Sequence, residues 1–261
     1  MRLKDTGLTA QDIKDKVSKY MIETYERFDF LAETAEGMYL YDENGTPYLD
    51  FYAGIAVNNA GNRNPKVVAA VKDQVDDIMH TFNYPYTIPQ ALLAEKVCKT
   101  LGMDKIFYQN SGTEANEAMI KMARKYGIEK YGPNRYHIVT AGSHGTTFGG
   151  HPISCAAALA EVGELLDRDL AGNAKKVGDY FAAKLEKLPH VKEVRHQGLL
   201  VGVEFDDTIS GVDVKHGCFD RKLLITAIGA HIIRMVPPLI VSEEECDKAV
   251  EIIEEAVKAL S

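Results

Sequence analysis

The sequence predicts a mixed α/β protein, and three observations lead to this fold class. Apolar residues with helical spacing alternate with short strand-like apolar runs along most of the 261 residues. The pair Asn44-Gly45 separates two arms of alternating apolar residues, which predicts a β-hairpin. Two glycine-containing turns, at residues 110–117 and 142–152, each follow a strand-like run and precede a helix-like segment.

The composition is that of a globular chain, with 46% hydrophobic and 26% charged residues. The net charge of -8 argues against a nucleic-acid partner, which would require a basic surface. We see no apolar run long enough to cross a bilayer and no secretory signal, so we expect a cytoplasmic protein with no membrane partner. The four cysteines (Cys98, Cys155, Cys218 and Cys246) are far apart, which predicts reduced thiols rather than disulfides or a zinc site.

The first third of the chain predicts two helices around a hairpin and a loop. Residues 9–28 have helical spacing, and Thr9 with Asp12 resembles a capping box. The hairpin spans residues 38–51, and the small-residue loop at 52–61 can pass close to a ligand or to another backbone. Pro65 then opens a helix that extends to about residue 80.

The next elements surround the first glycine-containing turn. Pro89 opens a helix that Gly102 closes. Residues 105–109 then predict a strand, and residues 115–126 predict a helix.

The turn at residues 110–117 is a candidate anion site. A small-residue turn between a strand and a helix leaves backbone N–H groups free at the positive end of the helix dipole, where phosphate binds readily. Ser111 and Thr113 add hydroxyl groups. The alternative is an ordinary helix N-cap, formed by Thr113 without any ligand.

The remaining chain alternates helices and strands, which predicts a compact α+β unit from about residue 156 onward. A strand is expected at 136–140, directly before the second glycine-containing turn. The other predicted elements are helices at 152–166, 173–188, 212–222 and 243–260, and strands at 191–194, 199–205 and 230–235.

Five segments together resemble the class III aminotransferases of the ornithine and acetylornithine type. They are Gly37 to Gly45, Tyr48 to Gly61, Asn110 to Glu117, His144 to Gly150 and Ile233 to Leu239, and they occur in the order of the family. The resemblance implies pyridoxal 5'-phosphate as cofactor and the type I fold of pyridoxal-phosphate-dependent transferases. It also implies a small-molecule amino donor, a 2-oxo acid acceptor and a homodimer or larger homo-oligomer.

The resemblance also implies roles for individual residues. Ser111, Gly112 and Thr113 correspond to the cradle of the cofactor phosphate, and Thr147 to a threonine that reaches the cofactor phosphate of the neighbouring subunit. Arg234 lies in the substrate-carboxylate region, although a surface arginine on a strand is the alternative interpretation. Ile55 and Ala56 correspond to positions that line the pocket.

By the same resemblance the chain divides into three parts. Residues 1–60 form an N-terminal segment that joins the small domain, residues 61–155 a remnant of the large cofactor-binding domain, and residues 156–261 the C-terminal small domain. One local departure is the stretch Gly61-Asn62-Arg63-Asn64-Pro65, where the family often has histidines.

The larger departure is a missing central segment at Ala141/Gly142, on the order of a hundred residues or somewhat more, since several βα units are absent. The segment carries the family's Schiff-base lysine and the aspartate that pairs with the pyridine nitrogen, and we can place neither in this chain. The large-domain sheet is therefore expected to be incomplete, and an exposed apolar patch is expected to cause association.

Three explanations remain open: an omitted segment, a genuine internal deletion, or a non-catalytic homologue that lends Thr147 and its C-terminal domain to a full-length partner. A normal Cα–Cα distance of about 3.8 Å throughout residues 140–144 would exclude the first.

The leading functional expectation is transfer of an amino group from an ornithine-like donor, such as N-acetylornithine or another ω-amino compound, to 2-oxoglutarate. Without the lysine, which serves as general base and acid, efficient catalysis by this chain alone is not expected. The alternative is a non-catalytic truncated homologue that associates with a full-length aminotransferase.

Overall fold

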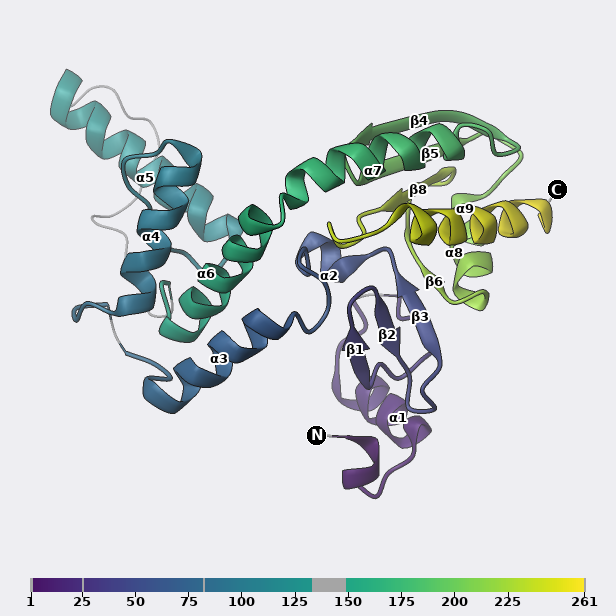
Figure 1. The fold of residues 1–261 in the computed structure, drawn as a ribbon, viewed down its shortest axis with the longest axis horizontal. Helices are drawn as coiled ribbons and strands as arrows, with labels where there is room; N and C mark the ends of the chain where they lie inside the picture. Colours follow the sequence, from purple (N-terminus) through teal and green to yellow (C-terminus); the bar gives the residue numbers. More distant parts are fainter. Residues whose placement is uncertain (1, 25, 82, 133–148, 261) are drawn as a thin grey trace. The chain divides into compact units, whose positions relative to one another are not determined.

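A computed structural model describes residues 2–24, 26–81, 83–132 and 149–260 (Figure 1). Within it the chain forms two compact units. The larger unit combines Met1–Asn64 with Glu164–Ser261, and the smaller unit is Pro65–Gly163. The chain thus leaves the larger unit once and returns to it, at positions close to the domain limits expected at residues 60 and 156.

The N-terminal half of the larger unit contains a four-stranded sheet in the order β1-β2-β3-β6. Strands β2 and β3 are the arms of the predicted hairpin, with Gly45 in the left-handed conformation that this turn requires. Strand β3 also pairs in parallel with β6, so the sheet joins the two ends of the chain. The elements are η1 (Leu3–Asp5), α1 (Ala10–Tyr20), β1 (Thr34–Glu36), β2 (Tyr39–Tyr41), β3 (Pro47–Asp50) and β6 (Leu223–Leu224).

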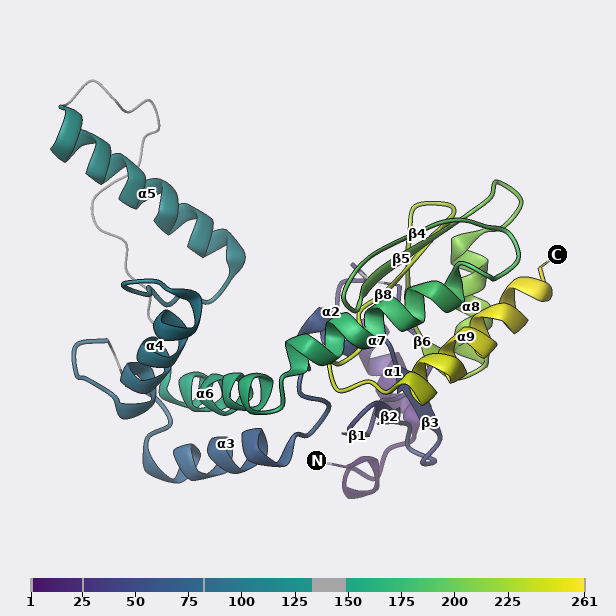
Figure 2. The same cartoon turned by 45° about the horizontal axis from the view of Figure 1, so that its top comes forward.

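The C-terminal half of the larger unit is built on a second four-stranded sheet, in the order β4-β5-β8-β7, whose strands are all antiparallel. Helices α7 and α9 pack on one another, and α7 also packs on β4 and β5 (Figure 2). The elements are α7 (Leu170–Leu185), β4 (Val191–Gln197), β5 (Leu200–Phe205), α8 (Gly211–Asp220), β7 (Thr226–Ile228), β8 (Ile232–Met235) and α9 (Glu243–Lys258).

The hydrophobic core lies between these helices and the inward face of the second sheet. Alternate residues of β5 and β8, including Val201, Val203 and Ile233, are fully buried there together with Phe181 of α7 and Ile253 of α9. Burial of each such side chain contributes about 1.5–3 kcal/mol. This cluster therefore accounts for most of the stability of the larger unit.

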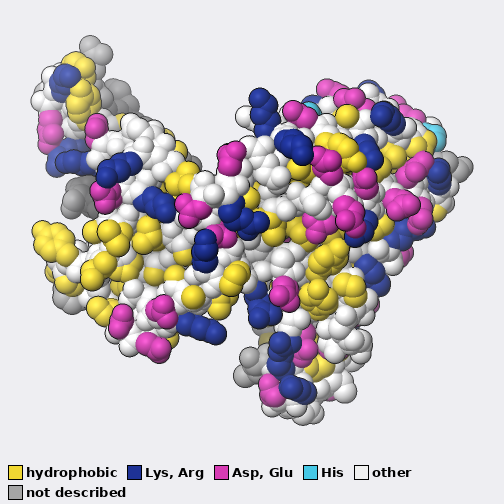
Figure 3. Space-filling model, in the orientation of Figure 1, with side chains coloured by type: hydrophobic (Ala, Val, Ile, Leu, Met, Phe, Trp, Pro, Cys, Tyr) yellow, Lys and Arg dark blue, Asp and Glu magenta, His cyan; other side chains and the backbone are white. Residues whose placement is uncertain are grey.

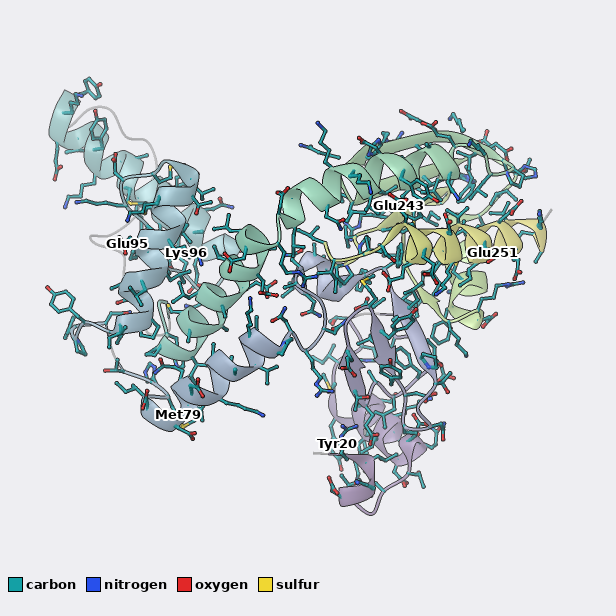
Figure 4. All side chains as sticks on the ribbon, in the orientation of Figure 1. Tyr20, Met79, Glu95, Lys96, Glu243 and Glu251 are labelled. Atoms are coloured by element: carbon teal, nitrogen blue, oxygen red, sulfur yellow. The ribbon has the colours of Figure 1, made fainter. Side chains whose placement is uncertain are left out.

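Local signals set the ends of several helices in this unit. Thr9 and Asp12 form the predicted capping box of α1, and Ser242 and Glu245 form a second one at α9. Glu243, labelled in Figure 4, lies in the first turn of α9 and pairs with Lys176 of α7 at 2.9 Å. Acidic residues in a first turn stabilise a helix through its dipole.

Asp50 holds the loop that follows β3. Its Oδ1 accepts hydrogen bonds from the N–H groups of Tyr52 (3.1 Å) and Ala53 (2.8 Å), and its Oδ2 accepts one from Asn62 Nδ2 (3.1 Å). The short element α2 (Ala53–Ala56) follows, and all four of its residues have positive φ. Such backbone is costly for residues other than glycine, so the carboxylate of Asp50 compensates for local strain.

The smaller unit contains helices with a small core. They are α3 (Pro65–Asp77), α4 (Ile88–Leu101), α5 (Gly112–Tyr131) and α6 (Pro152–Asp167), and Gly102 closes α4 in the left-handed conformation as predicted. Among the described residues of this unit, the buried hydrophobic side chains are those of Leu93, Ala118 and Cys155.

The strand predicted at residues 105–109 does not form, and this prediction was wrong. A strand needs a neighbour that pairs with its backbone, and no described segment of the smaller unit is a strand. The strand expected at 136–140, and the junction whose Cα–Cα distance was to be tested, lie outside the described residues. Strands β1, β6 and β7, and the short α2, were not predicted. No helix among the described residues is long and apolar enough to span a membrane.

The cysteines are free thiols, as predicted, and they differ in burial. Burial raises the pKa of Cys218 and of Cys246 to about 12, whereas Cys98 is half-buried. A thiol with a raised pKa forms little of the reactive thiolate at pH 8. We therefore expect iodoacetamide at pH 8 to modify Cys98 of the native protein before Cys218 and Cys246, as mapped by peptide mass spectrometry. The same reaction in urea should modify all four; early labelling of Cys218 in the native protein would contradict the packing of α8.

Removal of the Asp50 carboxylate should destabilise the larger unit. Asp50→Ala leaves two backbone N–H groups and one amide without their acceptor, which we expect to lower the free energy of unfolding by about 3 kcal/mol. Urea denaturation measures this change. The control is Asp29→Ala, since the exposed Asp29–Lys14 pair should contribute less than about 1 kcal/mol. Equal effects of the two substitutions would show that Asp50 does not hold the loop.

Candidate functional site

The N-terminus of α5 has the geometry of an anion site. Ser111 is the N-cap, with extended backbone, and its Oγ accepts a hydrogen bond from the N–H of Glu114. Helix α5 therefore begins at Gly112, and the expectation that Thr113 is the cap was wrong: Thr113 lies in the first turn. The first N–H groups of a helix have no acceptor within the helix, so those of Gly112 and Thr113 point toward its N-terminal end.

The carboxylate of Glu114 already uses part of this N-terminus. It accepts hydrogen bonds from the N–H of Asn110 (2.9 Å), from Asn110 Nδ2 (3.2 Å) and from Ser111 Oγ (3.1 Å). These bonds, first that from the Asn110 side chain, lower the pKa of Glu114. The helix end is thus stabilised by a negative group of the chain itself, while the N–H groups of Gly112 and Thr113 remain directed outward.

The pocket-lining candidates lie in the larger unit. Ile55 and Ala56 belong to the left-handed segment that Asp50 holds, and Ile55 is 58% exposed. Thr147 lies outside the described residues. Ser111, Gly112 and Thr113 lie in the smaller unit, so the structure places the candidates in two groups, one on each unit.

Arg234 lies in β8, on the sheet face opposite the core. Its Cα pairs with that of Gly202 on one side and with that of Thr226 on the other. The Arg234 side chain lines a pocket of about 440 Å³, whose other walls include Leu200, Ile228 and Ile232. The Nε atom of Arg234 is buried and has no hydrogen-bond partner. A buried guanidinium nitrogen without an acceptor is costly, and a carboxylate provides the matching acceptor.

Arg195 of β4 lies on the other side of Gly202 and lines the same pocket. Unlike Arg234, it is neutralised within the chain by Glu193 and by Glu204, the latter at 2.9 Å. These acceptors keep Arg195 in place and raise its pKa, first through Glu204. Arg234 is therefore the arginine of this pocket with an unsatisfied buried donor.

Sequence reasoning did not identify Arg195, Gly202 or the apolar wall as parts of this pocket. A β-carbon at Gly202 would meet no atom closer than the Arg195 carbonyl at 3.9 Å, so the glycine leaves the floor of the pocket open. The available signal was the alternation Val201-Gly202-Val203 in β5, which places the glycine on the face opposite the core.

A phosphorylated cofactor finds a fitting group in this chain at one end only. The N-terminus of α5 can hold its phosphate. For the carbonyl end a lysine is required, and the lysines nearest the cradle in sequence are Lys105 and Lys121. Lys121 pairs with Glu117 at 3.6 Å on α5, and neither lysine belongs to a motif that would serve this role.

The chain matches the family Aminotransferase class-III over residues 20–141 and again over residues 136–257. The acetylornithine aminotransferase of Caldanaerobacter subterraneus is 26% identical over 387 positions, which cover 93% of this chain and 98% of the relative. That of Methanocaldococcus jannaschii is 27% identical over 386 positions, covering 92% and 96%. Since 93% of this chain is about 243 residues, about 144 positions of the first alignment lie opposite gaps in this chain.

Solved structures show the same fold. An ornithine aminotransferase from Plasmodium yoelii superposes with a TM-score of 0.88 at 20% identity, covering 97% of this chain and all of the other. An acetylornithine aminotransferase from Elizabethkingia anophelis gives 0.86 at 21% identity, covering 97% and 100%. The fold is therefore type I of the pyridoxal-phosphate-dependent transferases, and the family match over most of the sequence identifies the chain as a member of the class III aminotransferases, a pyridoxal-phosphate-dependent family.

Proposed function

We propose that this chain is an acetylornithine-type aminotransferase homologue that retains substrate-carboxylate and cofactor-phosphate binding. Its ligands would be an ornithine-like amino donor, such as N-acetylornithine, and 2-oxoglutarate. The observation that carries the proposal is the buried, unpartnered Nε of Arg234 at the wall of an open pocket.

Arg234 is proposed to bind the substrate carboxylate. A guanidinium offers two parallel N–H donors that match a carboxylate. The neighbouring walls from Leu200, Ile228 and Ile232 suit an aliphatic chain attached to that carboxylate. Ile55 and Ala56 are proposed to line the same substrate region, which the strained backbone of α2 supports, because such strain concentrates at functional sites.

Ser111, Gly112 and Thr113 are proposed to hold the phosphate of pyridoxal phosphate, with Thr147 reaching the phosphate of a neighbouring subunit's cofactor. When bound, the cofactor supplies an electron sink for amino-group chemistry. The residues of this chain would orient it through the N–H groups and hydroxyls at the start of α5. We also propose that residues 61–155 are the remnant of the large domain and residues 156–261 the small domain, with residues 1–60 joined to it, and that the protein is cytoplasmic.

The chain by itself is proposed to be a poor catalyst. Transamination requires a lysine that binds the cofactor and then moves a proton, and no lysine of this chain occupies the corresponding motif. About 144 positions of the Caldanaerobacter relative lie opposite gaps, and the two family matches meet at residues 136–141. Both observations support a missing segment at the place where the lysine would be carried.

The second candidate function is that of a non-catalytic homologue that associates with a full-length aminotransferase. The exposed apolar side chains of the smaller unit favour it, because an apolar surface of that kind promotes association. Co-purification with a longer aminotransferase would support this function.

Replacement of Arg234 should weaken carboxylate binding. We expect Arg234→Gln to reduce the affinity for 2-oxoglutarate at least tenfold, since the charged bidentate donor is lost. Ligand-observed NMR titration of the full chain measures the affinity. The control is Arg221→Gln, because Arg221 pairs with Glu255 on the surface, at 3.1 Å. Equal affinities of Arg234→Gln and the unsubstituted chain would refute the carboxylate assignment.

Amino transfer by the chain alone should be absent. With pyridoxal phosphate, N-acetylornithine and 2-oxoglutarate present, we expect glutamate formation no faster than in a protein-free blank. The full-length acetylornithine aminotransferase of Caldanaerobacter subterraneus serves as the positive control. Turnover above the blank, abolished by Lys105→Ala or Lys121→Ala, would mean that a lysine of this chain replaces the missing one.

A further inference from the structure

The exposed large hydrophobic side chains are concentrated in the smaller unit. Of the 27 such side chains among the described residues, 17 lie in Pro65–Gly163, although this unit holds 99 of the 261 residues. Of 34 buried hydrophobic residues, three lie there. Figure 3 shows hydrophobic side chains, in yellow, over this unit. The smaller unit thus has less core than its apolar content would allow.

One exposed stripe runs along α5. Ala115, Met119, Met122 and Tyr126 follow one another at spacings of four, three and four residues, which places them on one face of the helix. The same spacing forms the seam of paired helices. Met119, Met122 and Tyr126 are 58%, 55% and 54% exposed. Methionine is a frequent residue of adaptable binding surfaces.

A second stripe lies on the opposite side of α5, formed by Ile120, Ile128 and Tyr131, which are also exposed. A helix that is apolar on both sides is normally buried among other elements. Ala118 is the buried residue of α5. Helix α5 therefore has more apolar surface than the described part of its own unit covers.

The charges along α5 favour a second copy of the same helix, in antiparallel orientation, as the partner. The N-terminal half carries Glu114 and Glu117, and the C-terminal half carries Lys125 and Lys130. Antiparallel pairing brings each acidic half against a basic half and opposes the two helix dipoles. Lys125 is 75% exposed at its side chain, and its pair with Glu129 is long, at 3.8 Å, so it can bind a partner's carboxylate.

The charge of the whole chain points to the same unit. The larger unit holds 20 basic and 29 acidic residues, a net charge of -9, and the smaller unit holds 10 and 9, a net charge of +1. Two copies would repel one another through their larger units and not through their smaller units. In Figure 3 acidic side chains, in magenta, accordingly gather over the larger unit.

The position of the missing segment also points to α5. The two family matches meet at residues 136–141, five residues after the end of α5, and about 144 positions of the Caldanaerobacter relative have no counterpart in this chain. We propose that two copies of this chain associate through antiparallel pairing of their α5 helices, with Met119, Met122 and Tyr126 in the seam. This interaction is independent of the ligands proposed above.

Sedimentation velocity of the full chain tests the pairing. We expect a dimer at micromolar concentration, and Met119→Glu/Met122→Glu should raise the dissociation constant at least about a hundredfold, because charges enter the centre of the seam. The control is Met21→Glu/Ile22→Glu, which alters exposed side chains of the larger unit and should leave the dimer unchanged. Circular dichroism must show unchanged helix content in both variants. A monomer at all concentrations, or a dimer that withstands the α5 substitutions, would overturn the proposal.

A charge exchange tests the orientation. Glu117→Lys and Lys125→Glu should each weaken the dimer, and the double exchange should restore it, since residues 117 and 125 face one another in the antiparallel pair. Absence of this rescue would exclude antiparallel pairing. Association with the full-length Caldanaerobacter enzyme but not with a second copy would also overturn the proposal. The affinity for 2-oxoglutarate should be unchanged in all α5 variants, so this test and that of Arg234 can fail separately.

Discussion

The larger unit depends on the burial of one sheet face. The inward residues of β5 and β8 are fully buried under α7 and α9, and the parallel pairing of β3 with β6 ties the N-terminal segment to the same body. With this face buried, the opposite face is left for Arg234 and its open floor at Gly202. The candidate carboxylate site is therefore a consequence of where the core lies.

The elements that could be predicted from the sequence are those whose signals are local. The turn at Asn44-Gly45 and the capping pairs Thr9–Asp12 and Ser242–Glu245 each lie within a few residues, and the structure has elements at all three places. The strand expected at 105–109 has the right residues, but its formation depends on neighbours that are distant in sequence. Strands β6 and β7 were missed for the same reason, because short strands are defined by their partners rather than by their own pattern.

The candidate site shows the same division. The anion position at the start of α5 follows from a local strand–turn–helix pattern, and the error was confined to which residue is the cap. The pocket beside Arg234 depends on the register of β4, β5 and β8, which no local pattern sets. The left-handed backbone at Ala53, Ile55 and Ala56 is disfavoured by these side chains and is imposed by Asp50.

Asn64 and Glu164 stand where the chain leaves and re-enters the larger unit, and Asn64 Nδ2 donates a hydrogen bond to Glu164 Oε2 at 3.0 Å. The smaller unit is thus a 99-residue loop between two joined ends. Loop-closure entropy grows with the logarithm of loop length, so a loop longer by 144 residues would cost the larger unit only about 0.8 kcal/mol more. Gain or loss of so large an insert therefore changes chemistry far more than it changes the fold that carries it.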